Sequence, residues 1–353
     1  MRKVDPDLLK AYVFKVWKYK QGEVVSLMVH LGDRLGLYEA MAGGAEFTPE
    51  ELAATSGLAE RMVREWLMGQ AAAGLLTRSP EGTYSLDPEG ERVLVDDSTV
   101  SFAAGAFIGG FPPDQVDGIL ESFRTGMGVT YHDMGDTVAR QIDRMNNAWV
   151  STYLLDRVLP QLHGVVDRLE AGAEVADIGC GGGISVRAMA RRFPASNFVG
   201  YEPSGHAVAH ARQRLADVDN ARLVQAGGEE LPGDARFDLV LTLDCMHDVP
   251  FPDRIAANIR GAIKQSGTWL IKDMKCSEVW ERNLKNPMLA LQYGYSVSAC
   301  LLSGASAEGG AALGTLGLPP VVAERIARDA GFGSFREFGL KDDPMHLYYE
   351  VRV

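Results

Sequence analysis

A glycine-rich run flanked by acids is the strongest chemical pattern in this sequence. Asp177 opens the run DIGCGGG over residues 177–183, and Glu202 follows 19 residues after its last glycine, at the end of the next apolar run. Glycines permit positive φ and let a ligand lie against the main chain, and an acid about 20 residues further on can hold the hydroxyls of a ribose. The pattern predicts a nucleoside site. Ile184 stands where a dinucleotide-binding motif has its third glycine, which counts against a nicotinamide cofactor.

A histidine after a second apolar run is the candidate general base. His247 and Asp248 follow the run 237–243. Ligands of open α/β sheets bind outside the carboxyl ends of strands, and a histidine there could take a proton from an acceptor hydroxyl. The alternative is that His247 only orders its loop, with Asp248 capping the next helix.

The elements that must position these residues alternate along residues 171–353. The predicted strands are 174–178, 197–201, 221–225, 237–243, 268–272, 334–338 and 346–353, and the predicted helices are 184–192, 204–215, 252–263 and 321–330. This alternation predicts an α/β, Rossmann-like domain with a mostly parallel sheet. Its last two strands form an antiparallel C-terminal hairpin.

The first hundred residues predict an α-rich winged-helix domain. Residues 24–41 have the apolar spacing of an amphipathic helix. Thr48 and Glu51 form a capping box at the start of a second helix. A third helix over 58–73 and two short strands around 80–82 complete the order helix, helix, helix, hairpin. Residues 101–170 are helical and rich in aromatic side chains, and we interpret them as a linker and lid that contributes to an acceptor pocket.

DIGCGGG followed by GYEPS (200–204) resembles the cofactor motifs of class I S-adenosylmethionine-dependent methyltransferases. The first domain resembles the winged-helix domain of small-molecule O-methyltransferases, in an actinobacterial-type family often labelled as transcriptional regulators. The resemblance implies S-adenosylmethionine as cofactor and S-adenosylhomocysteine as product. It implies that Asp177 and the backbone of Gly179 to Gly181 hold the methionine end, and that Glu202 holds the ribose. The predicted cofactor-binding residues are Asp177, Gly179, Cys180, Gly181, Gly183, Glu202, Pro203, Glu229 and Leu243.

One departure concerns the adenine. Relatives often carry an acid near the adenine amino group, and Gly227 stands at that position here. Either Glu229 substitutes for it or the backbone alone holds adenine.

The resemblance also assigns the base. In winged-helix O-methyltransferases the histidine of a His-Asp pair at this place is the general base, a role that falls on His247. Asp273 matches the first of the two carboxylates that flank it. The second is expected around residues 314–318, where the sequence has no acid. We therefore expect the base to be held differently here.

An acceptor pocket is expected from aromatic, histidine and methionine side chains of the lid and of the insertion before the last helix. The candidates are Tyr131, His132, Trp149, Tyr153, Met288, Tyr293 and Tyr295. The alternative is that most of them are core or dimer contacts.

No metal site is predicted. His206 and His210 share a helix face but lack the glutamate of a metalloprotease motif. His132, His247 and His346 are far apart in the sequence and could meet only through the fold. The four cysteines form no CxxC pair, which fits free thiols in a reducing compartment.

Composition limits the partners. The chain has 353 residues with a formal charge of −12, and the first hundred contain 11 basic and 16 acidic residues, so nucleic acid is disfavoured. We expect the winged-helix domain to form a homodimer, as it does in the resembled enzymes. No apolar run reaches about 18 residues, and the N-terminus lacks the pattern of a signal peptide, so we expect a cytoplasmic protein without a membrane partner.

The sequence thus predicts methyl transfer to a small aromatic or hydrophobic acceptor, with oxygen favoured over nitrogen or carbon. One alternative is a transcriptional regulator that binds DNA and senses S-adenosylmethionine. Another is a protein that uses the charge of the cofactor for a different reaction.

Overall fold

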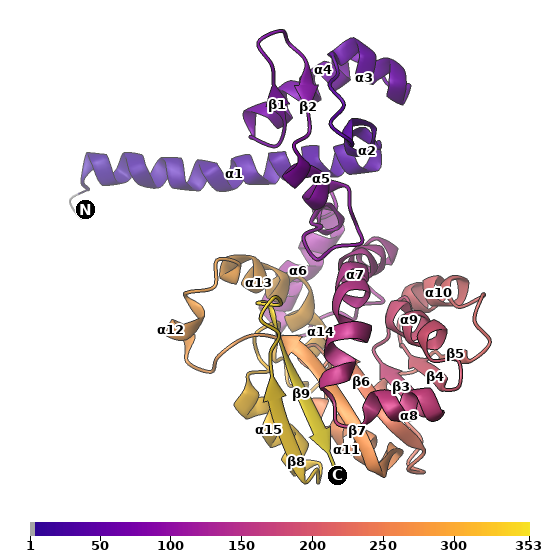
Figure 1. The fold of residues 1–353 in the computed structure, drawn as a ribbon. Helices are drawn as coiled ribbons and strands as arrows, with labels where there is room; N and C mark the ends of the chain where they lie inside the picture. Colours follow the sequence, from indigo (N-terminus) through magenta and orange to yellow (C-terminus); the bar gives the residue numbers. More distant parts are fainter. Residues whose placement is uncertain (1–3) are drawn as a thin grey trace. The chain divides into compact units, whose positions relative to one another are not determined.

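The computed structural model describes residues 4–353. The chain forms two compact units that meet in sequence at Pro112 and Pro113, and each is described separately (Figure 1). The first unit corresponds to the predicted winged-helix region together with a short stretch beyond it.

The first unit contains helices and one small hairpin. Its elements are α1 (Pro6–Arg34), α2 (Leu37–Met41), α3 (Pro49–Ser56), α4 (Glu60–Ala72), β1 (Thr77–Arg78), β2 (Tyr84–Ser85), α5 (Pro88–Leu94) and the 3-10 turn η1 (Ala104–Ala106). The capping box predicted for α3 is present, since Thr48 accepts from the Glu51 amide and Glu51 from the Thr48 amide. The strands β1 and β2 pair antiparallel, as predicted.

The prediction of one helix over residues 24–41 was wrong in two respects. Gly36 takes φ 68° and separates α1 from α2, a conformation that ends a right-handed helix. The helix α1 also begins at Pro6, far before the predicted start, and Asp5 caps it by accepting from the amides of Asp7 and Leu8. Figure 1 shows α1 reaching well beyond α2–α5. The apolar side chains of its first half are exposed.

The core of the first unit joins α1, α2 and α4. Tyr38 is fully buried and packs edge-on against Trp66, with ring centroids 5.3 Å apart. The Trp66 indole donates to the Met28 carbonyl (2.9 Å) and the Tyr38 hydroxyl to Gln70 (2.8 Å). These bonds satisfy polar groups that would otherwise be costly in the core.

The second unit is built on a seven-stranded sheet with the order β5-β4-β3-β6-β7-β9-β8. Its strands are β3 (Glu174–Ile178), β4 (Asn197–Tyr201), β5 (Ala221–Val224), β6 (Phe237–Leu243), β7 (Ile263–Met274), β8 (Ser334–Phe338) and β9 (His346–Arg352). The strands β3 to β7 pair parallel, and β9 is antiparallel to both of its neighbours. This confirms the predicted α/β fold and its antiparallel hairpin. The main difference is β7, which begins five residues before the predicted start.

The helical elements of the second unit precede the sheet or connect its strands. They are α6 (Pro113–Thr125), α7 (Asp136–Trp149), the π-helix η2 (Val150–Val158), η3 (Leu159–Gln161), α8 (Val165–Ala171), α9 (Ile184–Arg192), α10 (Gly205–Arg214), η4 (Gly228–Glu230), α11 (Pro252–Ala262), α12 (Trp280–Asn283), α13 (Leu289–Tyr295), the π-helix η5 (Ser296–Cys300), α14 (Leu301–Gly304) and α15 (Pro320–Asp329). Within residues 4–353, no helix is both long and apolar enough to cross a membrane.

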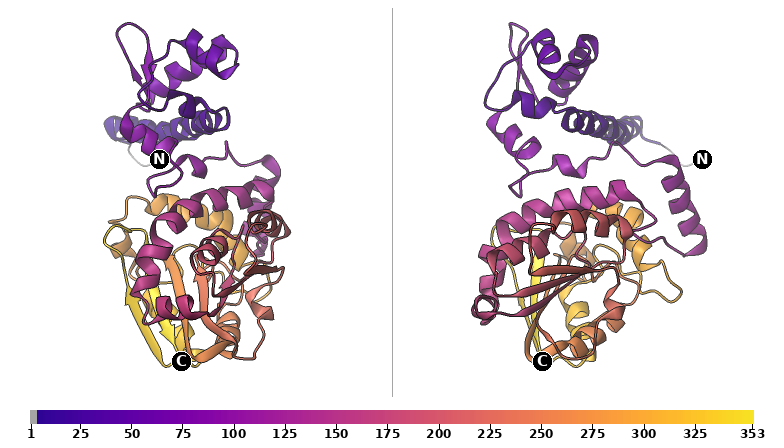
Figure 2. Two further views of the ribbon diagram at one scale, coloured as in Figure 1. Left: turned by 45° about the vertical axis from the view of Figure 1, so that its right-hand side comes forward. Right: turned by 90° about the vertical axis from the view of Figure 1, so that its right-hand side faces the viewer.

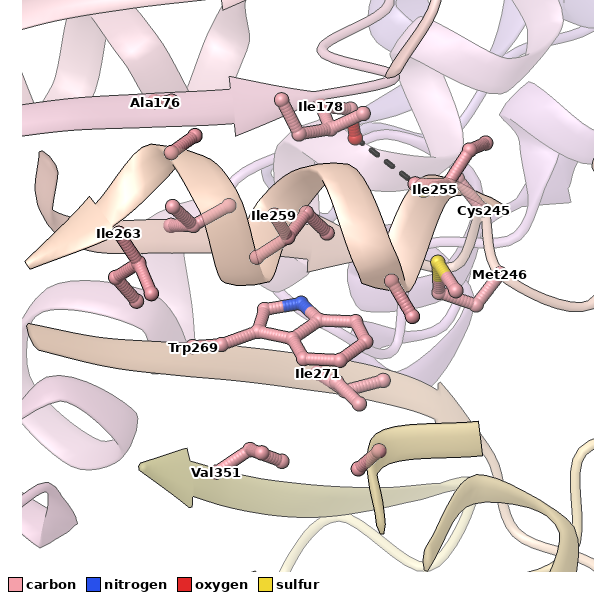
Figure 3. Packing of buried hydrophobic residues seen from close by; sticks show 14 of the residues in the cluster. Ala176, Ile178, Cys245, Met246, Ile255, Ile259, Ile263, Trp269, Ile271 and Val351 are labelled. Carbon is pink, nitrogen blue, oxygen red and sulfur yellow. Dashed lines mark hydrogen bonds between the residues drawn. The ribbon is translucent and has the colours of Figure 1, made fainter. Parts of the chain in front are cut away.

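Helices cover both faces of the sheet, so the second unit has three layers (Figure 2). One apolar cluster joins the sheet to α11 and α15, and Figure 3 shows Ile255 and Ile259 of α11 packed over Trp269 of β7. A second cluster joins the other face to η2, η3, α8 and α9. Burial on both faces fixes the strand register and hence the positions of the loops at the carboxyl edge.

Candidate active site

The carboxyl ends of β3 and β6 mark the place where the sheet reverses its strand order. The chain runs from β3 to its neighbour β4 on one side and later returns to β6 on the other side of β3. Such a switch point leaves a crevice between two diverging loops. The glycine-rich run follows β3, and the loop that carries His247 follows β6, so both predicted sites lie at this one edge.

The glycine-rich turn requires residues without side chains. Gly179, Gly181 and Gly183 have φ of 69°, 54° and 75°, in the left-handed region that glycine adopts at little cost. A Cβ on Gly179 would also lie 2.9 Å from the Cβ of Cys245 in the facing loop. The turn is held by its own amides, since those of Gly179 and Cys180 donate to the Tyr201 carbonyl and that of Gly183 donates to the Cys180 carbonyl.

Asp177 carries a buried and only partly satisfied carboxylate. The Ser185 hydroxyl, in the first turn of α9, donates to its Oδ2, while Oδ1 is buried with no hydrogen-bond partner. Burial raises the pKa of Asp177 to about 7, and the charge of Glu202 adds to this. An unpaired acceptor oxygen at this position suits a cationic ligand group.

Glu202, at the end of β4, is the second buried acid of the crevice. It accepts from the amide of Gly181 (3.0 Å) and from the amide of Ser204 (2.8 Å). Burial raises the pKa of Glu202. Within residues 4–353 neither Asp177 nor Glu202 forms an ion pair with a basic side chain, so a bound cation would offset two uncompensated carboxylates.

A clamp on the glycine-rich turn was not predicted from the sequence. Asp143 of α7 accepts from the amide of Gly182 (2.9 Å) and from Arg214 of α10 (2.9 Å). Arg214 also donates to the Gly182 carbonyl. These bonds tie the turn to two helices and fix its peptide groups. Asp143 lies 34 residues before the turn in sequence, in a helix whose local pattern gives no sign of this contact.

His247 and Asp273 form a buried pair at the same edge. The Nδ1 atom of His247 lies 2.8 Å from Oδ1 of Asp273, and the two residues are 3% and 0% exposed. The Met274 amide also donates to Oδ1 (2.7 Å), which fixes the carboxylate. Because Asp273 accepts from Nδ1, the Nε2 atom of neutral His247 keeps its lone pair. The register Leu243↔Lys272 between β6 and β7 brings these two residues together.

Further ionisable groups surround this histidine. Burial lowers the pKa of His247, but the charge and hydrogen bond of Asp273 outweigh it, and the pKa stands well above its ordinary value. Burial raises the pKa of Asp248 to about 7, and Tyr131 donates a hydrogen bond to it. Asp248 does not cap α11, whose N-cap is Phe251 without a side-chain bond. It supplies a second carboxylate beside His247, where the sequence had none at 314–318.

Two family models match the chain. Residues 175–267 match the model described as "Methyltransferase domain", and residues 23–95 match the model described as "Rv2258c-like winged HTH domain". The first spans the two loops of the crevice, and the second spans the helices and hairpin of the first unit. The chain therefore contains a methyltransferase domain preceded by a winged-helix domain.

Curated relatives match part of the methyltransferase. The ubiquinone biosynthesis O-methyltransferase of Azotobacter vinelandii is 36% identical over 100 residues, which is 28% of this chain and 42% of that enzyme. The match thus spans less than half the length of the relative.

Solved structures match this chain over almost its whole length. Human N-acetylserotonin methyltransferase in complex with S-adenosylmethionine has a TM-score of 0.69 at 15% identity and covers 100% of this chain and 99% of its own. An O-methyltransferase family protein from Burkholderia thailandensis has a TM-score of 0.64 at 20% identity, with 96% and 98% covered. At these identities the likeness shows the fold.

The remaining predicted cofactor residues of the methyltransferase lie around the crevice. Cys180 is buried within the turn, Pro203 is exposed after Glu202, and Leu243 is half-buried at the end of β6. Glu229 folds back so that its carboxylate lies over Gly227, where a Cβ would overlap it. The glutamate thus occupies the place of the side chain that Gly227 lacks.

The predicted acceptor residues divide into groups. Tyr131 lies beside the His247 loop, with a hydrogen bond to Asp248 and its hydroxyl 3.6 Å from Sγ of Cys300. Met288 and Tyr293 are exposed on the insertion around α13, and Tyr295 is half-buried there.

Trp149 and Tyr153 are packing residues. They are 5% and 3% exposed, and the Trp149 indole donates to Asp343 (3.2 Å) and Tyr348 (3.0 Å). Tyr153 donates to the Asp342 carbonyl (2.5 Å). Their placement agrees with the alternative that part of the aromatic set belongs to the core.

His132 lies against the start of α10, beside Gly205. Its ring stacks on His206 of α10, with centroids 4.8 Å apart. His210, one turn further along α10, bonds Asp136 (2.6 Å). The loop before α7 therefore contacts both the His247 loop, through Tyr131, and α10, through His132.

Proposed function

We propose that this methyltransferase transfers the methyl group of S-adenosylmethionine to an oxygen of a small aromatic or hydrophobic acceptor. The observation that carries the proposal is the position of the His247–Asp273 pair at the same switch point as the glycine-rich turn and its two buried acids, of which Asp177 has an oxygen without a partner. A cofactor held by the turn and an acceptor beside His247 would then meet at one edge of the sheet.

The cofactor fits the donors and acceptors of the crevice. Asp177 and the backbone of Gly179 to Gly181 would hold the methionine end, since Oδ1 of Asp177 is a buried acceptor without a partner. Glu202 would accept from the ribose hydroxyls, and Glu229 would reach the adenine amino group in place of the acid missing at Gly227. Cys180, Gly183, Pro203 and Leu243 would line the site.

S-adenosylmethionine supplies a methyl group already activated by its sulfonium charge. The protein must position the acceptor, exclude water and remove the hydroxyl proton. His247 would accept this proton at Nε2 as the general base, because Nδ1 is engaged by Asp273. Asp273 would orient the imidazole and stabilise its protonated form.

Calorimetric titration with S-adenosylmethionine tests the cofactor site. Asp177→Ala and Glu202→Ala should each weaken binding by roughly 1–3 kcal/mol, as the loss of a charge-assisted hydrogen bond does. Glu170→Ala removes an exposed acid of α8, before the amino end of β3, and should leave affinity unchanged. Wild-type affinity in both site variants would contradict the proposed site.

The winged-helix domain is proposed to form a homodimer. The arginines of α4 are paired with glutamates, Arg61 with Glu65 (2.5 Å) and Arg64 with Glu60 and Glu50 (2.5 Å each). These pairs neutralise the helix that would read DNA, whereas a DNA reader presents a basic face. A tight, sequence-specific gel shift at physiological salt would overturn this assignment and favour the regulator.

A further inference from the structure

His247, the proposed base, belongs to a buried cluster of ionisable groups to which the proposed cofactor site assigns no role. The imidazole of His247, the carboxylate of Asp248 and the thiol of Cys300 each offer one atom within 4.8 Å of the other two. They come from the loop after β6 and from the π-helix η5, which are more than 50 residues apart in the sequence. Only the fold brings them together.

These three groups are suitable ligands for zinc. Zinc prefers thiolate, imidazole and carboxylate ligands in a tetrahedral arrangement, and three protein ligands leave a fourth position open. Magnesium prefers oxygen ligands and does not suit the thiol. The combination therefore favours Zn²⁺ over Mg²⁺.

The surroundings of His247 match the usual support of a zinc-bound histidine. Metal-binding histidines commonly donate their second ring nitrogen to a carboxylate, which fixes the ring and its tautomer. Asp273 accepts from Nδ1 of His247 at 2.8 Å, so Nε2 is the ring nitrogen that would bind a metal, in place of its hydrogen bond with Cys300. Asp273 is itself fixed by the Met274 amide.

The charge of the cluster also favours a cation. Asp248 and Asp273 are both buried, and within residues 4–353 neither is paired with a lysine or an arginine. The nearby Lys272 is engaged by Asp244. Tyr131 bonds both Cys300 and Asp248, so its hydroxyl hydrogen-bonds two of the three ligands when no ion is bound.

We propose that His247, Asp248 and Cys300 bind a Zn²⁺ ion that inhibits the methyltransferase. Binding forms a Zn–S bond to Cys300, a Zn–N bond to Nε2 of His247 and a Zn–O bond to Asp248, as the thiol proton of Cys300 and any proton on Nε2 of His247 leave to solvent. The same Nε2 lone pair cannot accept a proton from the acceptor, so zinc binding and base catalysis exclude each other. The inhibitory part rests on the proposed function, whereas the metal site does not.

Metal binding is measured on the full-length protein by competition for ZnCl₂ with a chromophoric chelator. The wild type should bind one Zn²⁺ per chain. Cys300→Ser should weaken binding at least 100-fold, and Asp273→Asn by about 10–100-fold as loss of a supporting carboxylate does. Cys276→Ser, which removes a different buried cysteine, should bind as the wild type does. CoCl₂ should give a thiolate-to-cobalt absorption band that Cys300→Ser lacks.

The proposed zinc site would be overturned if the wild type removed no zinc from the chelator. It would also be overturned if Cys300→Ser bound zinc as tightly as the wild type. In turnover assays normalised to each variant's own rate without metal, ZnCl₂ should inhibit the wild type in the range in which it binds, and Cys300→Ser only at much higher concentration. Unchanged turnover of zinc-loaded protein would overturn the inhibitory role. Absent turnover in metal-free protein would instead contradict the proposed function.

Discussion

Asp177 combines burial with an unsatisfied oxygen, and this gives cofactor binding a pH dependence. Burial raises the pKa of Asp177 to about 7, so the free protein carries this acid largely protonated below pH 6 and ionised above pH 8. A cationic ligand binds the ionised form. The dissociation constant of S-adenosylmethionine should therefore fall as the pH rises through 7, as measured by titration calorimetry in buffers of matched ionic strength.

Asp177→Asn should bind more weakly and lose most of this pH dependence, because the amide does not titrate. Glu202 has a raised pKa as well, so Glu202→Gln is the companion variant. Its affinity for S-adenosylmethionine should still increase as the pH rises through 7. An affinity of the wild type that is constant between pH 6 and 8 would contradict the role of Asp177.

At the scale of residues, the sequence predicted groups that a local pattern marks. Asp177 and Glu202 follow apolar runs at the spacing of a nucleoside site, and His247 follows a third such run, so strand ends alone place them at one edge. Asp143 and Cys300 have no such mark, because they reach the crevice through tertiary packing of α7 and η5. Asp248 was recognised in the sequence beside His247, but its hydrogen bond with Tyr131 depends on the loop before α7.

The glycine-rich turn depends on elements on either side of it. A Cβ on Gly182 would overlap the Asp143 carboxylate and crowd Arg214. We expect Gly182→Ala to displace Asp143, break its bond to the turn and weaken S-adenosylmethionine binding about tenfold, the equivalent of one hydrogen bond to a charged group.

Gly233→Ala is the matched control, since a Cβ there meets nothing within 4 Å. It should bind the cofactor as the wild type does, with a melting temperature close to it. If Gly182→Ala also bound with wild-type affinity, the clamp would have no part in holding the turn.

Most elements were predictable because the apolar runs and the turn or charged residues that bound them indicated the same element. The strands β3, β4, β6 and β8 match their predicted bounds, since each is a short run bounded by turn or charged residues. The first half of α1 was missed because apolar residues lie on several of its sides. Leu8, Val13, Phe14 and Trp17 are exposed as well as the residues of one stripe, so no single apolar face stands out in the sequence.

The whole molecule offers an unpaired apolar surface along α1. Leu9, Tyr12, Val16 and Tyr19 recur at steps of three and four residues and are 53%, 66%, 52% and 69% exposed. Contiguous exposed apolar surface of this kind marks an interaction site. We expect a second copy of the chain to cover it, so Tyr12→Glu combined with Val16→Glu should shift the protein from dimer to monomer in sedimentation equilibrium.

Lys10→Glu changes an exposed residue of the same helix outside this stripe and should remain dimeric. A wild-type protein that sediments as a monomer at tens of micromolar would contradict the proposed dimer. The domain would then require another partner.

Release of S-adenosylhomocysteine, measured by mass spectrometry, tests the central claim most directly. Wild type, His247→Ala and the exposed-histidine control His163→Ala would be incubated without added metal with phenols, catechols, hydroxyquinones and amines. We predict turnover on a hydroxylated class, unchanged in His163→Ala and about 10²–10⁴-fold lower in His247→Ala, with cofactor affinity retained. Turnover of His247→Ala at the wild-type rate would contradict the base, and cofactor binding without turnover on any class would contradict the transferase.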